Sequence, residues 1–553
     1  MKNIILTPPP AILAFINECK IYKKTKTAVL VLLFSISLPA AAAAQITSTS
    51  AFVEGYVDAA AQTMEIGANL AFDATRLSAP VDKTINLQGN SISFNNYVYT
   101  SSASGGAFYV EKGNLSFNNG SLNFENNSAS DGGAIYNTDN SIMDFIDASA
   151  DFTGNSASMG GGAISNSYNA VLNFTSSTIN FTGNNAVDGG AISNVNFSTM
   201  NFENANANFT RNNASGSGGA IYNAYGANAN FIGSTITFSQ NYAKNGSAIY
   251  AYSSSVTFTN GEITFEFNSA DNGGAIYITD VSAIEFANLS AVFTYNMAGV
   301  SGGSLYNSNS VMNFTGSTLT FMGSTSISSG GAIYSYLFAD FNFTSSTVNF
   351  EDNISHGNGG AVYNYYSSMT FNASEVNFTS NSADNGGAIY NYNFGSMKFI
   401  DAKTNFVDNE AASGGSIYNY YSEINFIGST TSFLNCVVDS NGGAILNYSL
   451  SLINFTNGQT NFINNMGVYG GAIFNDSGSR VTFTNGKVIF EDNTGDYGGA
   501  SYNASSAINI TNASAAFTNN VAAGSGGAIY TDTSTIVVRN SEISFTSNSA
   551  DNG

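Results

Sequence analysis

The sequence is poor in the side chains on which most enzymes and nucleic-acid-binding proteins depend. Its 553 residues include one His and 15 Lys plus Arg, against 37 Asp plus Glu, for a formal net charge of −22 at pH 7. A surface so acidic argues against nucleic acid and anionic lipid as partners. The one histidine, His356, has no His or Cys beside it in the sequence. We therefore expect it to lie exposed in a loop rather than to act as a base or a metal ligand.

Cysteine is almost absent as well. Cys19 falls in the amino-terminal segment described below, and Cys436 is alone in the rest of the chain. Once that segment is removed, neither an intramolecular disulfide nor a cysteine metal cluster is possible. The fold must be stabilised by packing, without covalent cross-links.

What the chain has in place of these groups is a repeat. A glycine pair followed by a small and an aliphatic residue, as in Gly132-Gly133-Ala134-Ile135, recurs 16 times at intervals of 27 to 29 residues. The pairs begin at positions 105, 132, 161, 189, 218, 246 (where Ser247 replaces the second glycine), 273, 302, 330, 359, 386, 414, 442, 470, 498 and 526. A fixed period of this length is typical of a solenoid, in which each repeat stacks on its neighbours.

Two hydrophobic anchors indicate how each repeat is built. The first is Phe in 14 of 16 copies, with Ile510 and Val538 in the others, and the second is Phe in every copy, seven residues later. Because side chains alternate along a strand, an unbroken strand would turn one anchor outward. A turn must therefore intervene, and turn-forming pairs such as Asn260-Gly261 follow the first anchor.

Together with a strand after each glycine pair, this arrangement predicts three short strands per repeat and no helix after residue 104. The fold class that we predict is all-β, a right-handed parallel β-helix solenoid of about 16 rungs of ~28 residues. The glycine pair would form a corner with positive φ. The Asn of Phe-x-x-Asn, replaced only by Ser324 and Cys436, has two interpretations, a left-handed turn position or a stacked amide ladder, and we expect some of both.

The ends of the chain depart from the repeat. In residues 1–44, lysines precede an apolar run of eleven residues and a string of alanines, which predicts a secretory signal peptide cleaved after Ala44. The run is too short to cross a bilayer of ~30 Å. Residues 45–104 predict an amino-terminal cap with a degenerate first rung and a short helix over 58–69. Residues 105–553 are repeats, and because the chain stops inside one, we expect it to be a fragment of something longer.

Two groups of side chains are candidates for binding. Acidic residues lie just before six of the glycine pairs: Asp131, Asp188, Asp271, Asp384, Asp439 and Asp496. Stacked carboxylates could bind Ca²⁺ weakly, but other copies have Ser or Asn there, so solvated turns are the favoured interpretation. No catalytic residue, cofactor or metal site is predicted.

A tyrosine that follows the aliphatic residue is the better candidate for a contact surface. It forms an unbroken series at Tyr222, Tyr250, Tyr277, Tyr306, Tyr334, Tyr363, Tyr390 and Tyr418. If the aliphatic residue points inward, the tyrosine points outward, giving an aromatic ladder that could contact a glycan or a protein. The alternative, which we favour, is that neighbouring tyrosines only support one another along the sheet.

Tandem Gly-Gly-Ala-Ile with Phe-x-x-Asn over residues 105–553 resembles the polymorphic outer membrane proteins of the chlamydial Pmp type. The resemblance implies an autotransporter passenger of a Gram-negative bacterium, at the cell surface, in the outer membrane or secreted. It also implies export and anchoring through a carboxy-terminal β-barrel that this sequence does not contain. The implied function is that of a non-enzymatic adhesin, whose partner would be a protein or glycan on a host or neighbouring cell.

Two other functions stay open. A polysaccharide lyase or hydrolase is a common use of the β-helix fold, but it needs a local cluster of carboxylates or basic residues, and the basic residues here are scattered. A passive structural surface filament is the other alternative. Binding to cells would distinguish the adhesin from the filament, and assays on glycans would test the enzyme.

Overall fold

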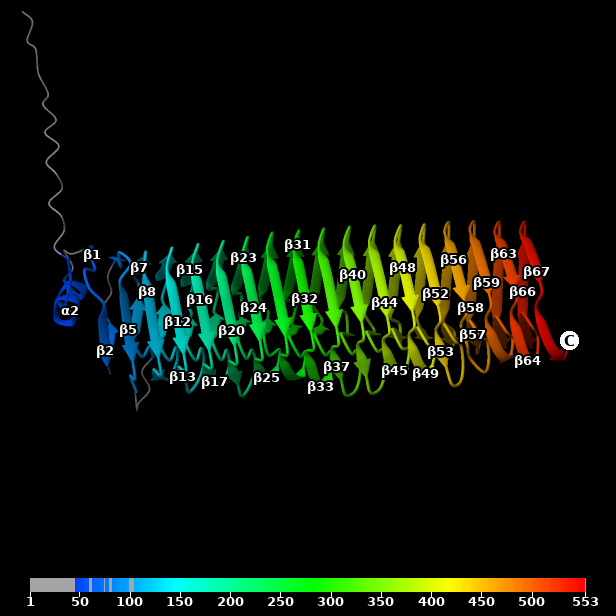
Figure 1. The fold of residues 1–553 in the computed structure, drawn as a ribbon, viewed down its shortest axis with the longest axis horizontal. Helices are drawn as coiled ribbons and strands as arrows, with labels where there is room; N and C mark the ends of the chain where they lie inside the picture. The colour runs from blue at the N-terminus through cyan, green and yellow to red at the C-terminus, as the bar shows by residue number, and fades with distance from the viewer. Residues whose placement is uncertain (1–44, 59–61, 74, 79–81, 99–103, 553) are drawn as a thin grey trace, which may run out of the picture. The chain divides into compact units, whose positions relative to one another are not determined.

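In the computed structural model, residues 45–58, 62–73, 75–78, 82–98 and 104–552 are described, and they belong to one compact unit. The predicted signal peptide, residues 1–44, lies outside the described residues. The unit is a β-solenoid in which strands of successive turns lie side by side in chain order (Figure 1). The predicted fold class, a parallel β-solenoid with turns of about 28 residues, is confirmed. Within the described part of the chain, no helix has the length and apolar character needed to span a bilayer.

Most full turns contain four short strands, where the sequence had predicted three; the turn of residues 445–472 has no fourth strand. One turn comprises β10 (Ile135–Thr138), β11 (Ile142–Ile146), β12 (Ser149–Thr153) and β13 (Ser156–Ala157). In the next turn the equivalents are β14 (Ile164–Asn166), β15 (Val171–Thr175), β16 (Thr178–Thr182) and β17 (Asn185–Ala186), and every pair is parallel. We call the four sheets, in this order, the glycine-pair, first-anchor, second-anchor and short-strand sheets. The short-strand sheet was missed because several of its strands, such as β13, have only two residues, and longer ones such as β29 (Ser269–Asn272) contain no large apolar residue to mark an inward face.

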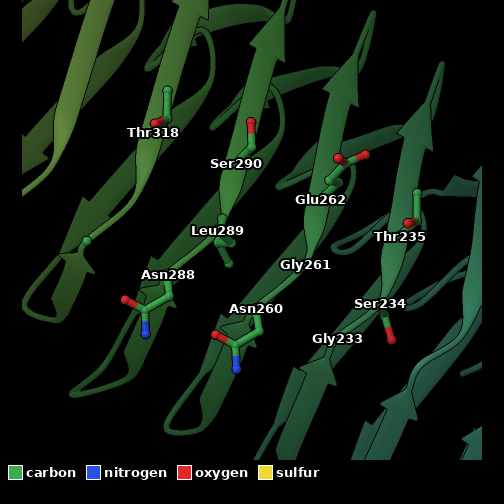
Figure 2. Close-up of a pocket in the computed structure, with 11 residues that line it drawn as sticks. Gly233, Ser234, Thr235, Asn260, Gly261, Glu262, Asn288, Leu289, Ser290 and Thr318 are labelled. Carbon is green, nitrogen blue, oxygen red and sulfur yellow. The ribbon is translucent and has the colours of Figure 1, made fainter.

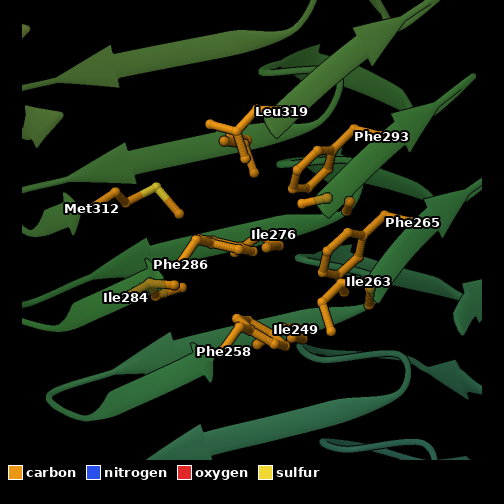
Figure 3. Close-up of a cluster of buried hydrophobic side chains, with 14 of the residues drawn as sticks. Ile249, Phe258, Ile263, Phe265, Ile276, Ile284, Phe286, Phe293, Met312 and Leu319 are labelled. Carbon is orange, nitrogen blue, oxygen red and sulfur yellow. The ribbon is translucent and has the colours of Figure 1, made fainter. Parts of the chain in front are cut away.

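The two anchors form continuous columns inside the solenoid. Phe145 pairs in register with Phe174, and Phe174 with Phe202, with ring centroids 5.0 and 4.6 Å apart. Figure 3 shows the same arrangement farther along, where Phe258 and Phe286 lie across the interior from Phe265 and Phe293. The turn predicted between the anchors is present, since Asn260 has a φ of 56°. Both anchors are thereby turned inward, and the columns are buried along most of their length.

The glycine pair is required by two different contacts. Gly132 has a φ of 58°, and a Cβ at this position would lie 1.9 Å from the carbonyl oxygen of Ile135. Gly133 lies against the next turn, where a Cβ would approach the carbonyl oxygen of Gly162 to 2.1 Å. The first glycine therefore makes the corner possible, and the second lets adjacent turns approach closely.

The asparagine of Phe-x-x-Asn forms a buried amide ladder. The Nδ2 atom of Asn155 donates to Oδ1 of Asn184 at 3.0 Å and to the carbonyl oxygen of Phe124 at 2.9 Å, and its backbone N–H donates to the same Oδ1. The left-handed position that we had assigned partly to this asparagine belongs instead to the residue before it, such as Gly154 or Gly183. The ladder interpretation is confirmed, and the turn interpretation was wrong by one residue.

A second buried amide ladder, which the sequence analysis missed, follows the glycine-pair sheet. Nδ2 of Asn137 donates to Oδ1 of Asn166, which donates in the same way to Asn194 and from there to Asn223, each at 2.8 Å. Its members also donate to backbone carbonyls at the start of first-anchor strands, as Asn137 does to Val171. The two ladders supply partners for polar groups that would otherwise be buried without hydrogen bonds.

The amino-terminal region differs from its prediction. The helix lies earlier, at α2 (Thr49–Val57), and residues 62–69, where a helix was expected, contain β1 (Thr63–Glu65). Beyond it lie β2 (Leu70–Asp73), β4 (Lys83–Asn86) and β5 (Ser91–Asn95). Ser48 caps α2 by accepting from the backbone N–H of Ala51. The sequence analysis placed the helix by the Ala-rich composition of residues 58–69 and did not use this capping serine. Phe52 and Tyr56 of α2 are buried, and Phe52 packs on Phe72 with centroids 5.3 Å apart.

Candidate contact surface

The predicted tyrosines form a stacked column on the outer face of the glycine-pair sheet. Successive rings from Tyr222 to Tyr418 have centroids 4.5 to 5.4 Å apart and interplanar angles of 2° to 34°. The aliphatic residue before each tyrosine points into the core, as expected from strand alternation. Because each ring covers the face of the next, the column presents ring edges and hydroxyl groups to the outside.

These tyrosines are half-buried rather than exposed, and Tyr363 is buried. Loss of hydration raises the pKa of the hydroxyl groups above the ordinary value near 10, in the case of Tyr418 to about 12. The same cause raises the pKa of Tyr222, Tyr250, Tyr277, Tyr306, Tyr334, Tyr363 and Tyr390. The hydroxyl groups therefore stay protonated and neutral near pH 7. Contact with another molecule stays a prediction for this column.

The candidate catalytic and metal-binding groups are dispersed. His356 is exposed after β41 (Ile354–Ser355), and its backbone N–H donates to the carbonyl oxygen of Ser326. Two of the corner aspartates bind backbone: Oδ1 of Asp131 accepts from the N–H of Gly160 at 3.3 Å, and Oδ1 of Asp188 from that of Ser217 at 2.8 Å. Over the residues that the structure describes, no three His, Cys, Asp or Glu side chains are grouped so as to hold a metal ion.

The two substitutions in the asparagine ladder are buried and have partners. The thiol of Cys436 lies 2.9 Å from Oγ of Ser416, and burial raises its pKa to about 12, which makes it a poor nucleophile near neutral pH. Oγ of Ser324 lies 2.7 Å from Oγ of Ser304. Both positions are structural.

One hollow on the surface is a shallow polar groove. It follows the corner between the first-anchor and second-anchor sheets over four turns and has a volume of about 670 Å³. Figure 2 shows its side chains, among them Asn260 and Asn288 on successive corners and Glu262 on the strand that follows. Glu262 is the only ionisable residue lining this groove. One carboxylate without a second acid, a base or a metal does not make a hydrolytic site.

A row of exposed apolar side chains was missed by the sequence analysis. It lies at the corner between the glycine-pair and first-anchor sheets in five successive turns, and we call it the corner ridge: Phe338, Tyr366, Phe394, Tyr421 and Leu450. Several other turns have Asn, Ser or Gly at this corner, such as Asn140, Asn309 and Gly478, although Phe197 and Val281 are exposed apolar residues there in isolated turns. An alignment of the 16 copies at the residues just after the Ala-Ile-Tyr-Asn strand would have shown the difference.

Comparison with known proteins identifies the repeat. Six segments match the Chlamydia polymorphic membrane protein repeat: residues 121–138, 149–167, 235–252, 347–365, 375–392 and 514–532. Each match begins in a second-anchor strand and ends at or near the end of the following glycine-pair strand, so that it contains the second anchor, the ladder position and the glycine pair. None of the curated proteins with which the chain was compared matches it.

Proposed function

The chain is a Pmp-type repeat protein, and we propose that it is the surface-displayed passenger of an autotransporter-type protein that acts as a non-enzymatic adhesin. The observation that carries the proposal is the occurrence of six polymorphic membrane protein repeats within one continuous β-solenoid. Such a solenoid presents the same outer positions turn after turn, which suits an extended binding surface. The expected setting is the surface or outer membrane of a Gram-negative cell, and the expected partner is a protein or glycan on a host or neighbouring cell.

Two features of the surface support binding rather than catalysis. The shallow polar groove contains a single carboxylate, and the one histidine is exposed and does not line it. Aromatic side chains, by contrast, are concentrated on the glycine-pair sheet and at its corner with the first-anchor sheet. Aromatic groups are enriched where proteins bind partners, because they provide a large contact area at low entropic cost.

The test is adhesion of beads coated with the purified chain. We expect them to adhere to cultured epithelial cells or to bacterial cells more than beads coated with an unrelated protein of equal net charge do, and soluble chain should compete. Adhesion no greater than that of the control beads on every cell type would refute the adhesin. Filaments seen by electron microscopy without adhesion would favour the structural alternative, and release of reducing ends from polysaccharides would favour the enzyme.

A matched pair of variants tests the tyrosine column within this function. Tyr306→Phe with Tyr334→Phe removes two hydroxyl groups and keeps the stacked rings, whereas Tyr306→Ser with Tyr334→Ser removes the rings as well. Serine occupies the equivalent position at Ser165 and Ser193, so the fold accommodates it. If the column contacts the partner through its hydroxyl groups, the variant with two Tyr→Phe substitutions should adhere more weakly than the parent chain. Equal adhesion by this variant and the parent would indicate that the column has only a structural role.

A further inference from the structure

The corner ridge places bulky side chains where the backbone disfavours them. Phe338, Tyr366, Phe394, Tyr421 and Leu450 have φ values of 61°, 50°, 64°, 52° and 60°. Large side chains are rare at positive φ and cost of order 1 kcal/mol or more there, whereas Asn and Gly are tolerated. Asn or Gly stands at the same corner in several other turns, and Phe197 and Val281 occupy it in isolated turns, so the fold itself does not require a run of bulky residues.

Burial does not compensate for this cost. Phe338, Phe394 and Leu450 are 65%, 60% and 61% exposed, and Tyr366 and Tyr421 are each 38% exposed. The rings touch one another edge to face, with centroids 5.1 Å apart for Phe338 and Tyr366 and for Phe394 and Tyr421. Such a contact contributes about 1 kcal/mol, which offsets part of the backbone cost. Contacts within the chain therefore offset the backbone cost only in part.

The corners alternate in length, and this alternation produces a hollow. Three residues separate β46 (Ile389–Tyr392) from β47 (Ser396–Ile400), two separate β50 (Ile417–Tyr420) from β51 (Glu423–Ile427), and three separate β54 (Ile445–Tyr448) from β55 (Leu452–Thr456). The longer corners carry the more exposed Phe394 and Leu450, and the shorter one between them carries Tyr421. These three side chains line a hollow of about 360 Å³ together with Ser396 and Glu423.

The ring geometry differs from that of the tyrosine column in a way that matters for binding. Tyr366 and Phe394 cross at 76°, and Phe394 and Tyr421 at 88°. Rings that cross edge to face do not cover each other's faces completely, whereas the stacked rings of the tyrosine column do. An aromatic face carries negative electrostatic potential, and it attracts the C–H groups on the apolar side of a sugar ring.

The polar groups around the hollow also suit a sugar. Oε1 of Glu423 accepts from Nδ2 of Asn425 at 2.9 Å, and a carboxylate has further acceptor capacity for the hydroxyl groups of a saccharide. The nearest basic residue along β47 is Lys398, which pairs in register with Asn425 on β51. Lys398 does not line the hollow, and Glu423 is the only charged residue that does, so the hollow does not favour an anionic ligand. The formal net charge of −22 disfavours sulfated or sialylated glycans.

We propose that the corner ridge binds a neutral oligosaccharide, with one sugar ring held in the hollow between Phe394 and Leu450 and above Tyr421. The proposal rests on the adhesin function and names its ligand class. Neighbouring turns place Phe338 and Tyr366 along the same line, so a chain of several sugars running along the solenoid axis contacts more of the ridge than a monosaccharide does.

The test compares glycan binding by the parent chain and by two variants. Phe394→Asn with Leu450→Asn removes both walls of the hollow, and Asn is well suited to positive φ, so the variant is expected to fold. Phe197→Asn is the matched control, because Phe197 has the same three-residue corner, a φ of 63° and 70% exposure but lies far from the hollow along the chain. Thermal denaturation of all three proteins verifies folding.

The probes are immobilised neutral oligosaccharides built from glucose, galactose, fucose and N-acetylhexosamines, together with their sialylated and sulfated counterparts. We expect the parent and the Phe197→Asn variant to bind at least one neutral oligosaccharide, and the double variant to bind it at least tenfold more weakly. Absence of neutral-glycan binding by the parent, unchanged binding by the double variant, or a preference for the anionic counterparts would overturn the proposal.

Bead adhesion by the same proteins separates this proposal from the adhesin function. If the double variant loses adhesion but the parent chain binds no neutral glycan, the ridge would bind a protein partner. That result would overturn the glycan proposal and leave the adhesin function standing. Adhesion that the double variant retains in full would overturn the ridge as a contact site. No adhesion by the parent chain would refute the adhesin itself.

Discussion

The asparagine ladder contains its own compensated substitutions, and they make a quantitative prediction possible. Ser324 and Cys436 are the two members that are not Asn, and each touches a serine that follows a glycine pair, Ser304 and Ser416. In the other 14 copies this residue is Ala. The hydroxyl group of Ser304 also lies 3.4 Å from Nδ2 of Asn296. A hydroxyl from the adjacent sheet thus replaces part of the missing amide.

We predict that Asn212→Ser destabilises its turns and that Ala191→Ser partly restores them. Asn212 donates through Nδ2 to the carbonyl oxygen of Phe181 at 2.9 Å and to Oδ1 of Asn241 at 3.1 Å, and its own Oδ1 accepts from Nδ2 of Asn184 at 2.9 Å. At ~1 kcal/mol for each lost hydrogen bond, and more where a buried partner is left unsatisfied, the loss is about 2 to 4 kcal/mol. Ala191 is the residue equivalent to Ser304 and is buried.

Ala191→Ser alone should be neutral or destabilising, since it buries a hydroxyl group without its partner. In the Asn212→Ser background it should recover about 1 to 2 kcal/mol, so that the double-mutant cycle gives a coupling of more than 1 kcal/mol. Asn213→Ser is the control, because Asn213 is exposed and adjacent in sequence; its cost should stay below about 0.5 kcal/mol.

The measurement must be local, because a solenoid need not unfold in one step. Native-state hydrogen exchange followed by mass spectrometry, on peptides that cover residues 184–241, reports the opening free energy of the affected turns. Additive effects of the two substitutions, or an Asn212→Ser cost as small as that of Asn213→Ser, would refute the reasoning.

Three further predictions concern the glycine corners, the buried thiol and the tyrosine column. Gly133→Ala should cost several kcal/mol in denaturant unfolding, because its Cβ would lie 2.1 Å from the carbonyl oxygen of Gly162, whereas Gly89→Ala, with open space around the Cβ, should cost about 1 kcal/mol for its positive φ. Cys436, with its pKa raised to about 12 by burial, should resist alkylation by iodoacetamide at pH 8 and react once the chain is unfolded; reaction in the folded chain at the rate of a free thiol would contradict the burial. The raised tyrosine pKa values predict stability that is complete below pH 10 and falls as the pH rises through the folded pKa values, since the unfolded chain ionises first; ultraviolet titration of tyrosine alongside circular dichroism would detect it, and tyrosines that all titrate near pH 10 in the folded chain would exclude it.

The parts of the fold that could be predicted are those that every copy repeats. The glycine pairs, the seven-residue spacing of Phe145 and Phe152, and the turn between them each recur often enough to identify a corner or an inward column. Their physical basis is steric or hydrophobic, and both can be recognised from residue type alone.

The parts of the fold that could not be predicted depend on which residue of a turn takes the left-handed conformation or on the length of a strand. The left-handed residue before Asn155 is Gly154, but in other turns it is Asn126, Phe267 or Tyr295, so residue type does not mark it. The short strand β13 has two residues, too few for a pattern. Helix α2 begins after the capping residue Ser48. Composition alone favoured the Ala-rich segment that follows, residues 58–69, as the position of the helix.

The tyrosine column shows why the candidate contact surface could be predicted from the sequence only in part. Alternation along the strand correctly placed Tyr306 and Tyr334 on the outer face, but it could not show that stacking would cover their ring faces. Exposure at a corner depends on whether two or three residues connect the strands, a difference that looked like loop variation in the sequence.

This contrast explains where function is found in a repeat fold of this kind. Positions that every turn needs are occupied by the same residue types because the core and the backbone require them, so they carry no information about a partner. Positions such as Phe394 depart from the residue that the corner favours and bury little area in return; single departures such as Phe197 and Val281 occur elsewhere at this corner, but only the corner ridge carries them in five successive turns. A departure that costs backbone free energy and yields little packing is a feature that a binding partner would explain, and the longest unbroken run of such departures at this corner is the corner ridge.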